Sequence, residues 1–281
     1  MQLTPRYGSD PLIVLDGDPA AVLEPVARQR RRFADRLRSF TDEQWAAPSR
    51  CEGWTNRDVI SHLDTTDRFW AHSIRAGVAG EPSRVLQGFD PVATPAMLVD
   101  AAREATTAEV VEAFLGSSED LVVLLEGLDA DGWTALAEAP PGHLPVSALA
   151  HHALWDCWVH ERDVLLPLGD VPPAEDDEVA ASLRYVAALG PALAVALGRE
   201  GSGTFGVSST APDLSFVVEA GDHIEVRSAA TSEVPVAFEL AGQGVDLLEA
   251  LSVRRPLEQA VPEAARWMLG GVREAFDAAS A

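Results

Sequence analysis

The spacing of apolar residues changes near Pro172-Pro173, and this change limits the possible folds more than any other feature of the chain. Ahead of the two prolines, apolar residues recur at the three- and four-residue intervals of amphipathic helices. Beyond residue 203, short runs of β-branched and aromatic residues alternate with turns that contain glycine. Helices followed by strands predict an α+β protein, with a helical domain over residues 18–168 and a small α+β domain over residues 174–281.

Capping residues mark the helices of the first domain. Asp18 and Pro19 can begin a helix, and Thr55 with Asp58 three positions on forms an N-terminal capping pattern. Together with helical periodicity, these signals predict an antiparallel bundle. Its segments are expected near 19–37, 55–76, 95–128 (with a break near 116–118) and 147–166. Loops are expected over 77–93 and 129–146.

The second domain is predicted to begin with a helix over 176–197. The runs 214–218 and 223–227 are joined by Glu219-Ala220-Gly221-Asp222, a short linker that indicates a hairpin turn. The other expected strands are 203–207 and 235–240, and the closing helices are expected over 244–251 and 262–279.

Composition excludes several kinds of chemistry and partner. The chain has 281 residues and a formal net charge of −23, and its basic residues are all arginine. Without lysine there is no Schiff-base lysine, no P-loop lysine and no lysine base. Nucleic acid and anionic membrane surfaces would repel so acidic a protein, so neither is an expected partner. Two cysteines cannot form a disulfide framework, and no basic leader precedes an apolar run, so a cytoplasmic location is expected.

Three polar residues recur at four-residue spacing on the last helix of the predicted bundle, namely His152, Asp156 and His160. Residues four apart share a helix face, with their Cβ atoms roughly 5–6 Å apart. Asp156 and His160 can therefore converge on one metal ion, with His62 of another helix as the natural third ligand. Three protein ligands leave an open position, which is typical of catalytic zinc and also fits a two-His-one-carboxylate iron centre. A buried core histidine or a helix-stabilising His–Asp pair is the structural alternative.

Two segments resemble the signatures of a known family. Residues 51–63 (CEGWTNRDVISHL) and residues 156–163 (DCWVHERD) are similar to the two signatures of the mycothiol-dependent maleylpyruvate isomerases, within the wider DinB-like metalloenzymes. The resemblance implies a DinB-like antiparallel four-helix bundle followed by a small sterol-carrier-like α+β domain. It also implies that His62, Asp156 and His160 bind a divalent metal, usually Zn²⁺. Fe²⁺ and Ni²⁺ are the alternative ions for the same ligands. Asp156 departs from the family's Glu and is shorter by one methylene group.

The resemblance extends to residues around the metal. It implies that an arginine late in the second domain faces the active site, so Arg254 or Arg255 is expected to hold an anionic group of the substrate. Cys51 and Cys157 are expected to be structural. Four side chains are expected to orient a metal ligand, namely His152, Glu161, Asp163 and Asp58. His152 is also a possible fourth ligand. Solvated surface charge is the alternative for each of these carboxylates and arginines.

These features favour a divalent-metal-dependent enzyme that activates a low-molecular-weight thiol, which the resemblance identifies as mycothiol. A metal-bound thiol is deprotonated and can attack a small electrophilic substrate, giving isomerisation or S-transfer. Two alternatives stay open. One is a hydrolase or lyase that uses metal-activated water. The other is a non-catalytic protein that holds a small ligand against the apolar strand at 216–218.

Overall fold

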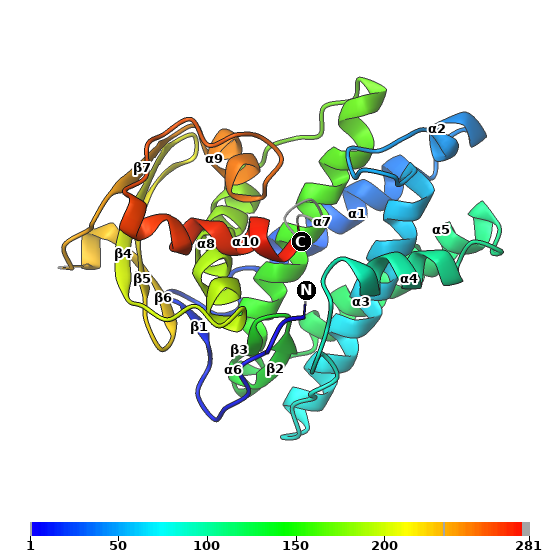
Figure 1. Cartoon of the computed structure of the whole chain (residues 1–281). Coiled ribbons are helices and arrows are strands. Elements are labelled where there is room, and N and C mark those ends of the chain that lie inside the picture. Colours follow the sequence, from blue (N-terminus) through cyan, green and yellow to red (C-terminus); the bar gives the residue numbers. More distant parts are fainter. Residues whose placement is uncertain (1, 233, 277–281) are drawn as a thin grey trace.

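The structure is a computed structural model that describes residues 2–232 and 234–276. It is an α+β protein in which a helical region packs beside a mixed five-stranded sheet (Figure 1). The α-helices of the helical region are α1 (Leu23–Leu37), α2 (Asp42–Ala46), α3 (Asn56–Val78), α4 (Ala93–Ala101), α5 (Thr107–Glu126), α6 (Ala130–Thr134) and α7 (Val146–Leu165).

Helix α7 is the central helix of this region. Helices α1 and α3 each contact both α5 and α7, so the four longest helices here form one packed group. Most residues of α7 are buried, including Trp158, which is fully buried. A helix enclosed on so many sides holds its polar residues in fixed positions, because neighbouring side chains leave few alternative rotamers.

A capping box explains one difference from the sequence prediction. The Thr106 side chain accepts a hydrogen bond from the Glu109 backbone N–H, and the Glu109 carboxylate accepts one from the Thr106 N–H. This begins a new helix, so the predicted helix over 95–128 is two helices, α4 and α5. The predicted break near 116–118 is wrong, because α5 runs through Gly116 without interruption.

The predicted loop over 129–146 contains regular structure. After the short helix α6, strands β2 (Leu136–Ala139) and β3 (Gly142–Pro145) form an antiparallel hairpin. Gly142 is required there. Its φ is +147°, and a Cβ at this position would lie 2.2 Å from the Arg6 carbonyl oxygen.

The sheet has the strand order β1-β6-β5-β4-β7. Strands β4, β5 and β6 are antiparallel neighbours, whereas β1 is parallel to β6 and β7 is parallel to β4. The bounds are β1 (Ile13–Leu15), β4 (Gly203–Thr210), β5 (Asp213–Ala220), β6 (Ile224–Ser228) and β7 (Glu239–Gly242). Strand β7 therefore begins later than the predicted 235–240. The hairpin turn is also shorter than predicted, because Ala220 is still paired in β5.

Three α-helices accompany the sheet: α8 (Asp176–Ala196), α9 (Gly244–Leu251) and α10 (Arg266–Phe276). Helix α8 contacts α7 on the bundle side and β5, β6, α9 and α10 on the sheet side. Among the described residues, α8 is the one helix long and apolar enough to cross a bilayer, and 83% of its apolar window is buried inside the structure. The end of the predicted helix over 262–279 lies outside the described residues. Short 3₁₀ turns occur at Leu166–Leu168, Ala229–Thr231 and Glu263–Ala265.

One hydrophobic cluster continues from α7 through α8 into the sheet. Strand β1, from the segment ahead of the predicted first domain, pairs within the sheet of the last third of the chain. The predicted boundary between residues 168 and 174 stays a prediction.

Candidate metal centre

Helices α3 and α7 bring together the three residues that the spacing selected. His62 lies on α3, and Asp156 and His160 lie one turn apart on α7. One ligand atom from each lies within 4.8 Å of the others. The Nε2 atom of His160 is 3.5 Å from Oδ1 of Asp156, and the rings of His62 and His160 meet edge to face at a centroid distance of 5.0 Å. Two imidazoles and a carboxylate at this separation fit a divalent metal such as zinc.

The electrostatic environment keeps His62 neutral and Asp156 ionised, which are the protonation states that bind a metal. Burial lowers the pKa of His62 to about 4, which keeps the imidazole neutral. Burial raises the pKa of Asp156, but His160 and His62 outweigh that effect and hold it below the ordinary value. Burial also lowers the pKa of His160, and Cys51, Asp163 and Asp156 reverse this to about 10.

Asp163 fixes the orientation of His160. Its Oδ2 accepts a hydrogen bond of 3.0 Å from Nδ1–H of His160, three residues earlier on α7. Because Nδ1–H is held by Asp163, Nε2, which lies toward Asp156, is the nitrogen whose proton a bound metal ion would replace. A carboxylate behind a ligating imidazole is a common arrangement, because it sets the tautomer and the ring plane.

A second group of possible ligands shares the same histidine. Cys51, His160 and Asp163 also place ligand atoms within 4.8 Å of one another. Cys51 Sγ lies 3.7 Å from His160 Nδ1 and donates toward Asp163 Oδ2 at 3.2 Å. Asp163, however, is already bound by the Arg254 guanidinium, and a cation there would face that positive charge. The group with His62 and Asp156 is therefore the better metal site.

We expect Cys51→Ser to retain the metal. Serine can replace the thiol hydrogen bond toward Asp163 with a hydroxyl one, and it removes only the sulfur, which the favoured site does not use. Cobalt-loaded protein provides the measurement, because thiolate ligation gives an intense near-ultraviolet charge-transfer band. Wild type should lack this band, and the Cys51→Ser variant should bind Co²⁺ within about twofold of wild type. A thiolate band that disappears in the variant would place the metal at Cys51 instead.

Cys51 and Cys157 differ in their surroundings. Cys51 is half-buried and touches the cluster, a contact that the sequence analysis missed although Cys51 stands in the same segment as His62. Its backbone lies in the turn before α3. The position of this turn depends on contacts with distant residues, such as the hydrogen bond from the Arg50 N–H to the Asp163 carbonyl. Cys157 is fully buried among apolar residues, and burial raises its pKa to about 12. This position agrees with the expected packing role.

Three predicted orienting residues make other contacts. His152 Nδ1 is 2.6 Å from the Tyr185 hydroxyl, and its ring packs edge-on against Trp70. Glu161 is buried against Arg32 of α1. Asp58 accepts hydrogen bonds from Thr55 as part of the α3 capping box. Within the described residues, none of the three belongs to either group of possible ligands.

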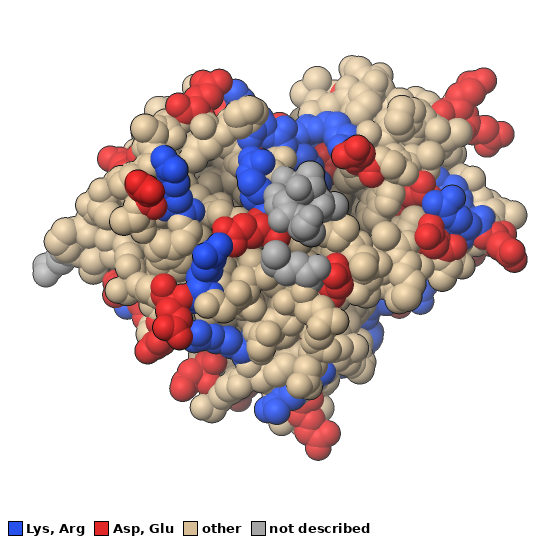
Figure 2. All heavy atoms as spheres, viewed as in Figure 1, with Lys and Arg blue, Asp and Glu red and all other residues tan. Residues whose placement is uncertain are grey.

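The two predicted arginines also separate. Arg254 reaches the cluster and binds Asp163 with its Nε and Nη2 atoms, at 2.8 to 3.1 Å. Arg255 points to the surface, where it pairs with Asp246. Figure 2 shows arginines and acidic residues interleaved over much of this face, with several arginines gathered along the notch at the top of the view.

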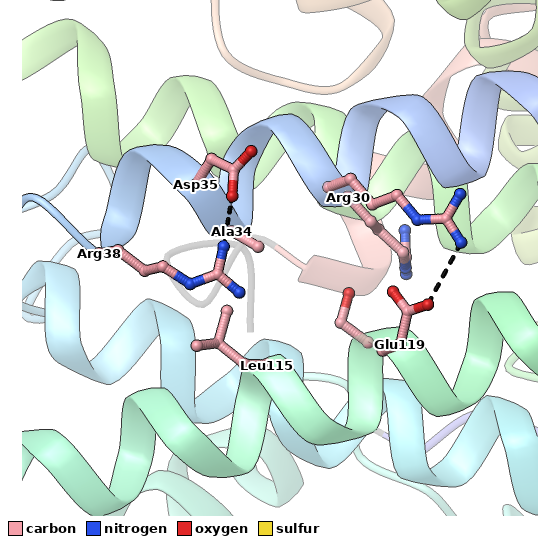
Figure 3. A pocket seen from close by; sticks show the side chains of 8 residues that line it. Arg30, Ala34, Asp35, Arg38, Leu115 and Glu119 are labelled. Atoms are coloured by element: carbon pink, nitrogen blue, oxygen red, sulfur yellow. Dashed lines mark hydrogen bonds and ion pairs between the residues drawn. The ribbon is translucent and has the colours of Figure 1, made fainter.

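A cavity of about 250 Å³ lies elsewhere, between α1 and α5. In Figure 3, Arg38 turns toward Asp35 along its rim, and Glu119 accepts from an arginine of α1 on the opposite side. His62, Asp156 and His160 do not line it. Each arginine that lines the cavity already has a carboxylate partner: Arg38 pairs with Asp35, Arg31 with Glu119 and Arg30 with Asp67. The cavity therefore adds nothing to the metal cluster.

Two facing helices therefore bring two histidines and a carboxylate together beside a mixed sheet, an arrangement that can hold a divalent metal. Residues 26–165 match the family described as the mycothiol maleylpyruvate isomerase N-terminal domain, and through these residues the chain belongs to that family. The resemblance seen in the two signatures is thereby confirmed.

Solved structures support the same fold. The crystal structure of the mycothiol-dependent maleylpyruvate isomerase superposes with a TM-score of 0.58, and that of a histidine-to-alanine mutant with 0.59. Each solved chain is 15% identical to this one, and each match covers 88% of this chain and 96% of the solved chain. At this identity the likeness establishes a shared fold. No curated protein sequence matches the chain significantly.

Proposed function

We propose that this protein is a divalent-metal-dependent enzyme that activates a low-molecular-weight thiol for isomerisation or S-transfer on a small electrophilic substrate. The convergence of His62, Asp156 and His160 inside a domain of this family is the observation that carries the proposal. Zn²⁺ is the favoured ion because its preferred ligands include imidazole and carboxylate. Mycothiol is the favoured thiol because the related solved enzyme is named for its dependence on it.

The residues divide the work in a simple way. His62, Asp156 and His160 would hold the ion through three atoms and leave a further position open to solvent. The bound ion supplies Lewis acidity, which lowers the pKa of a coordinated thiol. The side chains of Asp156 and His160 are 14% and 10% exposed and His62 is also partly exposed, so the cluster borders solvent. Asp163 keeps His160 in the tautomer that presents Nε2.

The proposal extends to the architecture and the partners. The helical region corresponds to a DinB-like antiparallel four-helix bundle, and the sheet with α8, α9 and α10 to a sterol-carrier-like domain. The substrate is a small molecule, and the acidic surface disfavours nucleic acid and anionic membranes.

The decisive experiment combines a thiol with a set of electrophiles. Zinc-loaded protein is incubated with mycothiol and either maleylpyruvate or an alkylating electrophile, and products are followed by mass and absorbance. We expect conversion that requires both metal and thiol. Conversion without thiol would indicate chemistry with metal-activated water. Metal-loaded protein that neither binds mycothiol nor converts any substrate would contradict the proposal.

A further inference from the structure

The turn that follows α9 reaches from the sheet side of the molecule to the metal cluster. Arg254 places three donor contacts on the two carboxylate oxygens of Asp163, and Asp163 is fully buried. Planar, two-sided contacts of this kind fix a carboxylate in rotation as well as in position. Asp163 in turn accepts the Nδ1–H of His160. An unbroken chain of hydrogen bonds therefore connects the turn after α9 to a metal-ligand candidate on α7.

The backbone of this turn is held in an unusual conformation. The Val253 N–H donates to the Ala250 carbonyl and the Arg254 N–H donates to the Glu249 carbonyl, which is the Schellman pattern of a helix end. Val253 occupies the left-handed position with φ of 60°, where glycine is usual and a β-branched residue is strained. Strained conformations of this kind cluster at functional sites, where the surrounding structure maintains them. Here the strained residue immediately precedes Arg254.

A second arginine strengthens the same connection. Arg50, which precedes Cys51, binds the Glu249 carboxylate through two nitrogens at 2.9 and 3.3 Å. Its Nε is 3.5 Å from Asp163 Oδ1, and its backbone N–H donates to the Asp163 carbonyl. Asp163 is therefore surrounded by His160, Cys51, Arg254 and Arg50. His160, Cys51 and Arg254 contact Oδ2, and Arg254 and Arg50 contact Oδ1.

We infer that Arg254 is a positioning residue of the metal centre: it holds Asp163, which orients His160, so that metal affinity depends on the turn after α9. This inference rests on the proposed function, because it concerns the same cluster. It assigns Arg254 a role different from contact with an anionic substrate group. The Arg254 guanidinium already binds Asp163, and it makes two further contacts, one to the Ser252 carbonyl at 3.3 Å and one to Cys51 Sγ at 3.9 Å.

Zinc affinity provides the test, measured by competition between the full chain and a chromophoric chelator. We expect Arg254→Gln to weaken Zn²⁺ binding by about 10–100-fold, the usual effect of losing an outer partner of a ligating histidine. Arg254→Lys should recover part of the loss, since it restores the charge but not the two-sided geometry. Arg255→Gln is the matched control, because its partner Asp246 lies at the surface, and it should leave affinity unchanged.

A double-mutant cycle separates positioning from a general loss of structure. In an Asp163→Asn background, Arg254→Gln should have little additional effect on zinc affinity, because its route to His160 is already interrupted. Additive losses would contradict the inference. Equal affinity in wild type and Arg254→Gln would also overturn it while leaving the proposed function intact. If wild type itself bound no zinc, the proposed function and this inference would both fail.

Discussion

His62→Ala should abolish tight metal binding while leaving the fold intact. The substitution removes one of three ligand atoms, and its effect should exceed the roughly 10–100-fold that an outer partner contributes. His62 keeps some solvent exposure, so its truncation should disturb packing less than the truncation of a fully buried side chain. Metal content of the purified protein and chelator competition give the result directly.

The matched control is His72→Ala on the same helix. His72 is an exposed residue of α3 and belongs to neither group of possible ligands, so its loss removes no candidate ligand. It should retain wild-type metal content and wild-type thiol-dependent activity. Loss of metal in both variants would show that α3 responds to any substitution, and retention in both would remove His62 from the site.

Gly271→Ala should strongly destabilise the fold, because it adds one methyl group where α10 crosses α8. A Cβ at Gly271 would lie 2.0 Å from the Gly190 carbonyl oxygen and 2.6 Å from the Ala194 nitrogen, both backbone atoms of α8. Backbone cannot rotate away as a side chain can, so the two helices must separate. We expect a loss of about 3 kcal/mol in the free energy of unfolding, near the upper end of overpacking effects. For a chain of this size, that corresponds to a fall in Tm of roughly 6–12 °C.

The neighbouring Gly270→Ala provides the comparison within the same helix. Its Cβ would meet only the Glu274 carboxylate, at 3.2 Å, which forms a solvent-exposed ion pair with Arg199 and can shift with it. Alanine is the better helix former, so this variant should gain up to about 1 kcal/mol. Thermal and urea unfolding of the two variants should therefore change in opposite directions. Similar losses in both would mean that the crossing of α8 and α10 is looser than the structure has it.

The helices and the ligand cluster could be predicted because their signals are local. The capping pattern at Thr55 begins α3, and four-residue spacing places Asp156 and His160 on one face of α7. Only one further assumption, that α3 faces α7, was needed to add His62. A spacing of four residues on a helix is enough to place Asp156 and His160 on one face, whatever the rest of the chain does.

The remaining features depend on contacts between distant segments. Cys51 and Arg254 come together around Asp163 although long stretches of chain separate them, and no periodicity encodes such a meeting. The start of α5 was misplaced for a different reason. Gly116 was taken as a helix breaker, but a glycine inside a helix costs only about 1 kcal/mol, which packing against α1 and α3 readily offsets. The capping box at Thr106 was the stronger signal.

Strand β1 has a consequence for how the chain is made. It is synthesised before the helical region, yet it pairs in parallel with β6, which leaves the ribosome only after that region is complete. Until then β1 has no strand partner, and β6 in turn presents an open edge until β1 arrives. Open edges of sheets pair readily with other chains. The final docking of β1 is therefore the step at which a slow or destabilised molecule would be most exposed to aggregation, and a shortened N-terminal segment would extend that period.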